Sequence, residues 1–206
     1  MPTQADLEAA RTYTSIMEEA KLRARSINTL TNSGFELPVS LRREYCFLQL
    51  RMLCELIALG CLVAHGDIEV TRSLRKAHHA GELVKRLEQL LPNFYPSPRK
   101  LDITPERVHL GDYDREFLTK SDLITLYGKC GDELHKGSLR RLLTPKQQPI
   151  KDFRDIQELG QKILNLLSVH LISRREGTFH LLTLLEAPQI GGNVLVSIAE
   201  SPASAK

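Results

Sequence analysis

The stretch LRREYCFLQLRMLCELIALGCLVAHG, residues 41–66, decides the fold of this chain. From Met52 to Ala64 only Glu55 and Gly60 interrupt its apolar residues, so the sequence predicts a helix that is apolar on every side. Such a helix lies at the centre of a bundle or at a subunit interface, because only there is it covered all round. Since this helix is more apolar than one bundle of this size needs, we also predict a homodimer formed through it.

Four further segments place apolar residues at the three- and four-residue steps of an amphipathic helix. They are residues 6–30, 73–91, 118–137 and 152–172. In the third of these, Thr119 or Ser121 is the expected N-cap. The period then changes to that of a strand in residues 178–187 and 193–200, on either side of a glycine-containing turn. These patterns predict five helices and one C-terminal β-hairpin.

The predicted fold class is therefore mainly α, or α+β, with a five-helix bundle over residues 4–173 and a small appended β-hairpin over residues 178–200. Residues 100–112 contain turn residues and short alternating runs, and the sequence leaves open whether strands lie there. The chain has 206 residues, of which 42% are apolar and 26% charged, which is ordinary for a single globular domain over residues 1–206.

The composition of the chain says less about its function than about its fold. The formal charge of +3 permits RNA or a nucleotide as a partner but does not require one. The four cysteines form no CxxC pair, and the chain has no GxxxxGK[ST], GxGxxG or HExxH motif. We therefore expect buried thiols, no metal site and no cofactor.

The N-terminal residues include acids and no apolar core of a signal peptide. The most apolar run, residues 56–64, is shorter than the ~20 residues of a membrane span. The sequence thus predicts a cytoplasmic protein without a membrane partner.

The best candidate site is YGKCGDELHKG, residues 127–137. Tyr127 and His135 lie two helical turns apart on one face, and the intervening glycines leave room for a ligand or another backbone. On the central helix Arg51 and Glu55 are spaced to pair with each other. We expect Tyr127 and His135 to line a groove near this pair, within ~12 Å, about one helix diameter, of Glu55.

Two roles are open for these residues. In the first, His135 is an acid–base group assisted by Glu55, and nearby cations hold phosphate oxygens. The expected binding residues are Arg51, Tyr127, Lys129, Lys136, Arg140 and Arg141. In the second, His135 is a helix-end histidine beside bases that complement the helix dipole, and Arg51 with Glu55 is a structural ion pair.

The apolar helix with LRMLCELIA and the later helix with YGKCGDELHKG resemble the HEPN superfamily of helical bundles, over residues 40–143. The resemblance rests on a Tyr and His pattern like Tyr127, His135 and Gly137. It implies an antiparallel bundle, dimerisation through the core helices, and a role in RNA cleavage or in nucleic-acid-associated defence or stress responses. Active members of that group carry Arg-x4-6-His, whereas Lys129 stands at the arginine position here, and lysine lacks the bidentate fork.

Three functions follow from this comparison of motifs. The first is a non-catalytic or degenerate HEPN-like module that binds nucleic acid, a nucleotide or a protein partner. The second is a metal-independent endoribonuclease with His135 as its acid–base group. The third is a purely structural interaction module. The lysine in place of arginine favours the first over the second.

Overall fold

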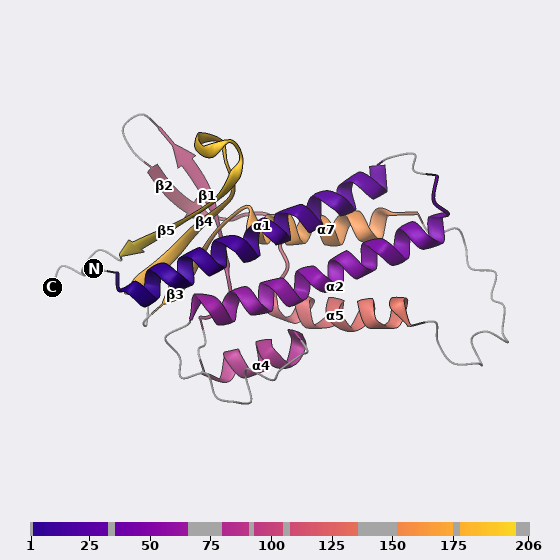
Figure 1. Cartoon of the computed structure of the whole chain (residues 1–206), viewed down its shortest axis with the longest axis horizontal. Helices are drawn as coiled ribbons and strands as arrows, with labels where there is room; N and C mark the ends of the chain where they lie inside the picture. The colour runs from indigo at the N-terminus through magenta and orange to yellow at the C-terminus, as the bar shows by residue number, and fades with distance from the viewer. Residues whose placement is uncertain are drawn as a thin grey trace.

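The computed structural model describes residues 2–32, 36–65, 80–90, 93–104, 108–135, 152–174 and 178–200. Within them lie five α-helices and a five-stranded antiparallel sheet (Figure 1). The helices are α1 (Gln4–Asn32), α2 (Val39–Ala64), α4 (Ala80–Leu90), α5 (Lys120–Leu134) and α7 (Arg154–Leu167). The strands are β1 (Ser97–Ile103), β2 (Val108–Asp112), β3 (Val169–Arg174), β4 (Phe179–Ala187) and β5 (Asn193–Glu200). The α+β class is as predicted.

The apolar helix α2 lies in the middle of the helical layer, with α1 and α5 on either side (Figure 1). Its inner face carries fully buried residues such as Leu50, Leu53 and Ile57. Gly60 permits the close approach of α1, because a Cβ atom there would come within 2.9 Å of Tyr13 Cε2. By length and composition α2 also qualifies as a membrane span, because an 18-residue stretch of it has a mean hydropathy of 1.9. In this fold 61% of that stretch is buried.

The predicted small hairpin is wrong in extent, because β4 and β5 belong to a larger sheet with strand order β2-β1-β3-β4-β5. The open question about residues 100–112 is answered by β1 and β2, which pair from Arg99 with Asp112 to Ile103 with Val108.

The last predicted helix is also too long, since α7 ends at Leu167 and β3 begins at Val169. His170, Ile172 and Arg174 are buried and alternate with partly exposed neighbours, which is the period of a strand. Six residues of β3 pair with β4. This pairing satisfies the backbone groups that the extra helical turn would have used.

Helix α1 packs against the sheet through contacts that join distant parts of the chain. The buried Arg174 Nη1 donates to Asp6 Oδ1 at 2.6 Å. Lys21 Nζ donates to the Gly192 carbonyl at 3.1 Å, and the Val194 amide donates to Glu18 Oε1 at 2.6 Å. These contacts fix α1 against β3, against β5 and against the turn that precedes β5.

Helix α5 begins at a capping box. The Asp122 amide donates to the Thr119 hydroxyl, and the Thr119 amide donates to the Asp122 carboxylate. Of the two predicted caps, Thr119 is therefore the one used. The segment predicted as a helix over residues 73–91 is described only from residue 80 to residue 90, where it is α4.

Candidate functional site

Three of the predicted site residues meet where α2 and α5 pack side by side. The Tyr127 hydroxyl donates to Glu55 Oε1 at 3.2 Å and accepts from Arg51 Nη2 at 3.0 Å. Arg51 Nε lies 3.4 Å from Glu55 Oε1, and the guanidinium carbon lies 4.8 Å from the centre of the Tyr127 ring. The α2 spacing explains the ion pair, because residues four apart share one helical face. We call these three residues the polar cluster.

The polar cluster is a closed hydrogen-bonding unit at the protein surface. The side chains of Arg51 and Glu55 are each 28% exposed, so water reaches both. Burial raises the pKa of Tyr127, and its phenol therefore stays protonated and able to donate at neutral pH. With Arg51 bound to both partners, the cluster has little free charge to offer to a phosphate.

The two glycines of α5 do not mark close backbone contact within the described chain. A Cβ atom at Gly128 would have no atom within 4 Å, and one at Gly131 would meet only Arg51 Nη1 at 4.0 Å. The expected approach of another backbone is thus not found among the residues that the structure describes. Among the described residues, only the space over Gly128 is open, since Arg51 lies over Gly131.

His135 lies apart from the polar cluster. It is the C-cap of α5, where it is exposed, and its amide donates to the Gly131 carbonyl at 3.0 Å. It follows Tyr127 by eight residues, about 12 Å along the helix. Helix α5 runs antiparallel to α2, so this step leads away from Glu55 (Figure 1). Within the described residues no hydrogen bond or ion pair joins His135 to Glu55, and a shared acid–base role for the two stays a prediction.

Lys129 belongs to a different group, near the start of α2. Its ammonium lies 3.7 Å from Asp155 Oδ2 and 5.7 Å from the centre of the Phe47 ring. Arg43 binds the same carboxylate with two hydrogen bonds, of 2.9 and 2.8 Å, and also donates to the Asp152 carbonyl. The hydrogen bonds from Arg43 lower the pKa of Asp155, which is therefore ionised at neutral pH.

The remaining predicted cations, Lys136, Arg140 and Arg141, lie outside the described residues. Within the described ranges, the cations of the candidate site are each bound to a carboxylate: Arg51 to Glu55 and Lys129 to Asp155. No group of three or more histidine, cysteine, aspartate or glutamate side chains in those ranges is arranged to hold a metal ion.

Sequence reasoning missed a buried pair of titratable residues. Tyr13 of α1 and His170 of β3 are both fully buried, with Oη and Nε2 2.6 Å apart. Burial lowers the pKa of His170 to about 4. Tyr13 falls in the predicted helix over residues 6–30 and His170 in that over residues 152–172. Nothing local in the sequence indicates that two residues 157 positions apart share a hydrogen bond.

The four cysteines are buried, as predicted, and three of them lie on α2. Burial raises the pKa of Cys46 to about 11 and that of Cys130 to about 12. These thiols are therefore protonated and shielded, and they are unsuited to nucleophilic chemistry.

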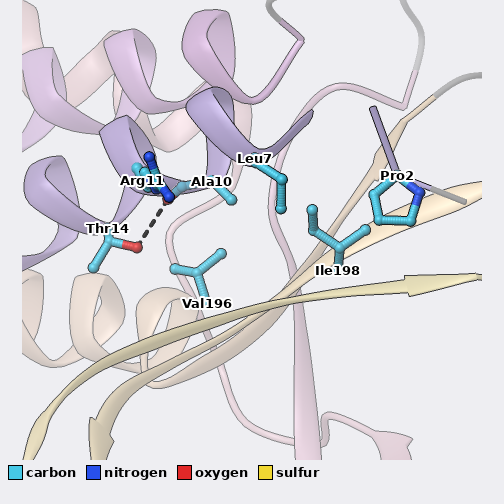
Figure 2. A pocket seen from close by; sticks show the side chains of 7 residues that line it. All are labelled: Pro2, Leu7, Ala10, Arg11, Thr14, Val196 and Ile198. Atoms are coloured by element: carbon cyan, nitrogen blue, oxygen red, sulfur yellow. Dashed lines mark hydrogen bonds between the residues drawn. The ribbon is translucent and has the colours of Figure 1, made fainter. Parts of the chain in front are cut away.

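An open pocket of about 290 Å³ lies between α1 and β5 (Figure 2). Its lining is mostly apolar: Pro2, Leu7, Ala10, Arg11, Thr14, Val196 and Ile198. Among the described lining residues Arg11 is the one charged group, and the Thr14 hydroxyl donates to the Ala10 carbonyl. The pocket has no pair of titratable groups suited to acid–base chemistry.

The outer face of α2 is a second surface feature, because within the single described chain α2 is not covered on every side; its place at a subunit interface stays a prediction. Large apolar side chains with 43–49% exposure lie along it, and Met52 is partly exposed among them. We call this surface the α2 stripe; it consists of Leu41, Tyr45, Leu48, Met52 and Leu59. Large exposed apolar residues that share one helix face are typical of interaction surfaces.

Comparisons of the chain with protein-family models, curated proteins and solved structures found no match.

Proposed function

We propose that this chain is a non-catalytic helical interaction module that binds a protein partner through the α2 stripe. The observation that carries the proposal is the row of exposed leucine and tyrosine side chains on a helix whose opposite face forms the core. Burying such side chains against a partner removes apolar surface from water, at about 25 cal/mol per Å². The polar cluster at the edge of the stripe holds α5 against α2, so the stripe is presented on a fixed support.

The charges near the stripe favour protein over nucleic acid as the partner. Binding to a nucleic acid derives mainly from cations that neutralise phosphates and release counterions. Here Arg43 and Lys129 share the Asp155 carboxylate, and Arg51 is bound to Glu55. These internal pairs would have to be broken or shared before a phosphate is bound.

The geometry of the described residues also gives little support to a ribonuclease. A general acid–base histidine is usually oriented by a hydrogen bond to a second group. The His135 side chain makes no hydrogen bond or ion pair in the described ranges, and Lys129 is directed to Asp155. The resemblance to the HEPN superfamily then points to a degenerate member, whose place in defence or stress responses is part of the proposal.

The first test concerns catalysis and RNA binding. Purified protein and the His135→Ala variant are incubated with labelled RNA in EDTA, and retention of RNA is measured at 50 and 200 mM salt, about the range over which phosphate contacts lose most affinity. We expect no cleavage and no salt-dependent retention. Cleavage that disappears in His135→Ala would refute the proposal in favour of the endoribonuclease.

The second test concerns the α2 stripe. Leu48→Asp places a charge in the stripe, whereas Leu22→Asp places the same charge at an α1 leucine that is 67% exposed and lies outside the stripe. Affinity capture with quantitative mass spectrometry compares both variants with the wild type. We expect a set of proteins that the wild type and Leu22→Asp retain and that Leu48→Asp loses. Identical captured sets for all three forms would contradict the proposal.

A further inference from the structure

We infer that the free edge of β5 binds an extended, acidic peptide segment of a partner protein, which adds a strand to the sheet beside α1. On the face turned towards α1, the peptide carries a carboxylate with an aliphatic side chain on either side of it. This inference goes beyond the proposed function, because the surface belongs to α1 and β5 and is separate from the α2 stripe. It is carried by the backbone groups of β5, the pocket beside them and the cation in the pocket lining.

Strand β5 is an edge of the described sheet, so every second residue points its backbone groups away from β4. The Val194 amide points that way, since it donates to Glu18 of α1 at 2.6 Å. By alternation, Val196 and Ile198 also direct their N–H and C=O groups to the free edge. Among the described residues, no hydrogen bond satisfies these groups.

The pairing within the sheet gives the same orientation. The Leu185 amide of β4 donates to the Ser168 carbonyl, on the side of β3. The preceding residue, Leu184, therefore directs its backbone groups to β5, where it pairs with Leu195. The even-numbered residues that follow on β5 are thus the ones that face outwards.

Helix α1 covers this edge only at the start of β5. Glu18 contacts the β5 backbone at Val194, whereas Asp6, three turns earlier on α1, binds Arg174 of β3. Strand β3 lies two strand spacings, about 10 Å, from β5. The helix therefore crosses inwards from the edge and does not follow the rest of β5.

The pocket between α1 and β5 lies in the angle that this crossing leaves (Figure 2). Leu7 and Ala10 face Val196 and Ile198 across it, and Leu7 is 42% exposed. A cavity of about 150 Å³ accommodates benzene, so a volume of about 290 Å³ has room for about two aliphatic side chains. An open site of this size would enclose a small molecule poorly, whereas a peptide is also held by its backbone.

Arg11 gives the pocket a preference for an acidic peptide. Its side chain makes no hydrogen bond or ion pair with the described residues, unlike Arg51 and Lys129. Arg11 follows Leu7 by one helical turn, about 6 Å, and alternate residues of a strand lie about 6.7 Å apart. A carboxylate beside Arg11 is therefore two peptide residues from an aliphatic side chain beside Leu7.

The added strand continues the antiparallel pattern of the described sheet. Val196 and Ile198 then each exchange two hydrogen bonds with the peptide residue opposite. Opposite residues place their side chains on the same face of a sheet. The peptide residues that bond to β5 are therefore the same ones that point their side chains at α1.

The first measurement is binding of the synthetic peptide TLTDTLT, labelled with a fluorophore at one end and amidated at the other. Its aspartate and leucines share one face of an extended chain, and its sequence reads the same in both directions. Fluorescence anisotropy should show binding to the wild type and about tenfold weaker binding to Arg11→Glu, because an attractive pair becomes repulsive. Arg25→Glu is the matched control, since Arg25 lies on the same helix outside the pocket and is 59% exposed; it should bind like the wild type.

The peptide TLTKTLT tests the charge in the opposite sense. It should bind Arg11→Glu more tightly than the wild type. Wild-type protein that does not bind TLTDTLT overturns the inference, and so does equal affinity of Arg11→Glu for the two peptides.

The second measurement tests strand addition with the native protein. A methyl group on a backbone nitrogen removes a donor, so N-methylated forms of TLTDTLT show which amides face β5. Methylation of the aspartate and both leucines should abolish binding, whereas methylation of the two threonines beside the aspartate should leave it. Equal binding of the two methylated peptides, or the reverse order, would overturn the antiparallel added strand.

Leu48→Asp separates this inference from the proposed function. The variant should bind TLTDTLT like the wild type, because Leu48 lies on α2 and not in the pocket. If Leu48→Asp loses captured proteins while the wild type does not bind the peptide, the inference fails and the proposed function stands. Peptide binding with identical captured sets for the stripe variants would give the opposite result.

Discussion

The buried His170 makes the stability of this fold sensitive to acid. Its Nδ1 lies 3.0 Å from the Leu167 carbonyl, which can only accept, so Nδ1 carries the proton. Nε2 is then an acceptor for the Tyr13 hydroxyl at 2.6 Å. A second proton on the ring would remove that acceptor and place a charge in the core. Burial accordingly lowers the pKa of His170 to about 4.

The size of the effect follows from proton linkage. An unfolded histidine has a pKa of about 6.5, so between pH 6.5 and about 4 the unfolded chain binds a proton that the folded chain does not. Stability is therefore complete above pH 6.5 and falls as the pH falls towards 4. At about 1.4 kcal/mol per pKa unit, the loss from pH 7 to pH 4 is about 3 kcal/mol.

Urea denaturation at pH 7 and pH 4 measures this loss of stability in the wild type, His170→Gln and His135→Gln. Glutamine offers Tyr13 an acceptor and does not titrate, whereas His135 is exposed and serves as the matched control. The pH-dependent loss should be about 3 kcal/mol smaller in His170→Gln than in the wild type, and unchanged in His135→Gln. Equal losses in all three proteins would refute the reasoning, because the carboxylates common to them would then account for the whole effect.

Three further predictions concern stability, each measured by urea denaturation. Gly60→Ala should be less stable than Gly128→Ala by about 1–3 kcal/mol. The new methyl group at position 60 would lie 2.9 Å from the buried Tyr13 ring, whereas the one at position 128 meets open space. Equal stabilities of the two variants would contradict this. Asp6→Asn should cost about 3–5 kcal/mol, since it removes the carboxylate that compensates the buried Arg174, and a loss below about 1 kcal/mol would argue against the ion pair. Tyr127→Phe should cost about 1 kcal/mol by removing the hydroxyl that links the polar cluster, and a more stable variant would show that this link is dispensable.

The parts of the fold that the sequence could predict are those determined by local spacing. The apolar core face of α2 and the start of α5 at Thr119 follow from helical periodicity and cap chemistry. Arg51 and Glu55 pair because a helix fixes their geometry before any tertiary contact forms. The placement of Tyr127 beside them followed from the need of a half-buried charge for a polar neighbour.

The parts that could not be predicted depend on distant partners. The helix predicted over residues 152–172 continued past Leu167 because the local pattern fits a helix, and only pairing with β4 selects β3. The meeting of Asp6 with Arg174 joins residues 168 positions apart. Nor could the sequence tell which apolar side of α2 would stay exposed, because that depends on where α1 and α5 pack.

The order in which this chain is synthesised runs against the order in which its contacts can form. Helix α1 is synthesised before the sheet that covers it, since Lys21 binds a residue 171 positions later and the partner of Glu18 lies 176 positions later. Throughout translation α1 therefore has its sheet-facing side uncovered, and the core closes only when β5 has emerged. Contacts of such sequence separation slow folding and expose apolar surface to other chains. The sheet-facing side of α1 thus stays open to contacts with other chains until β5 is made.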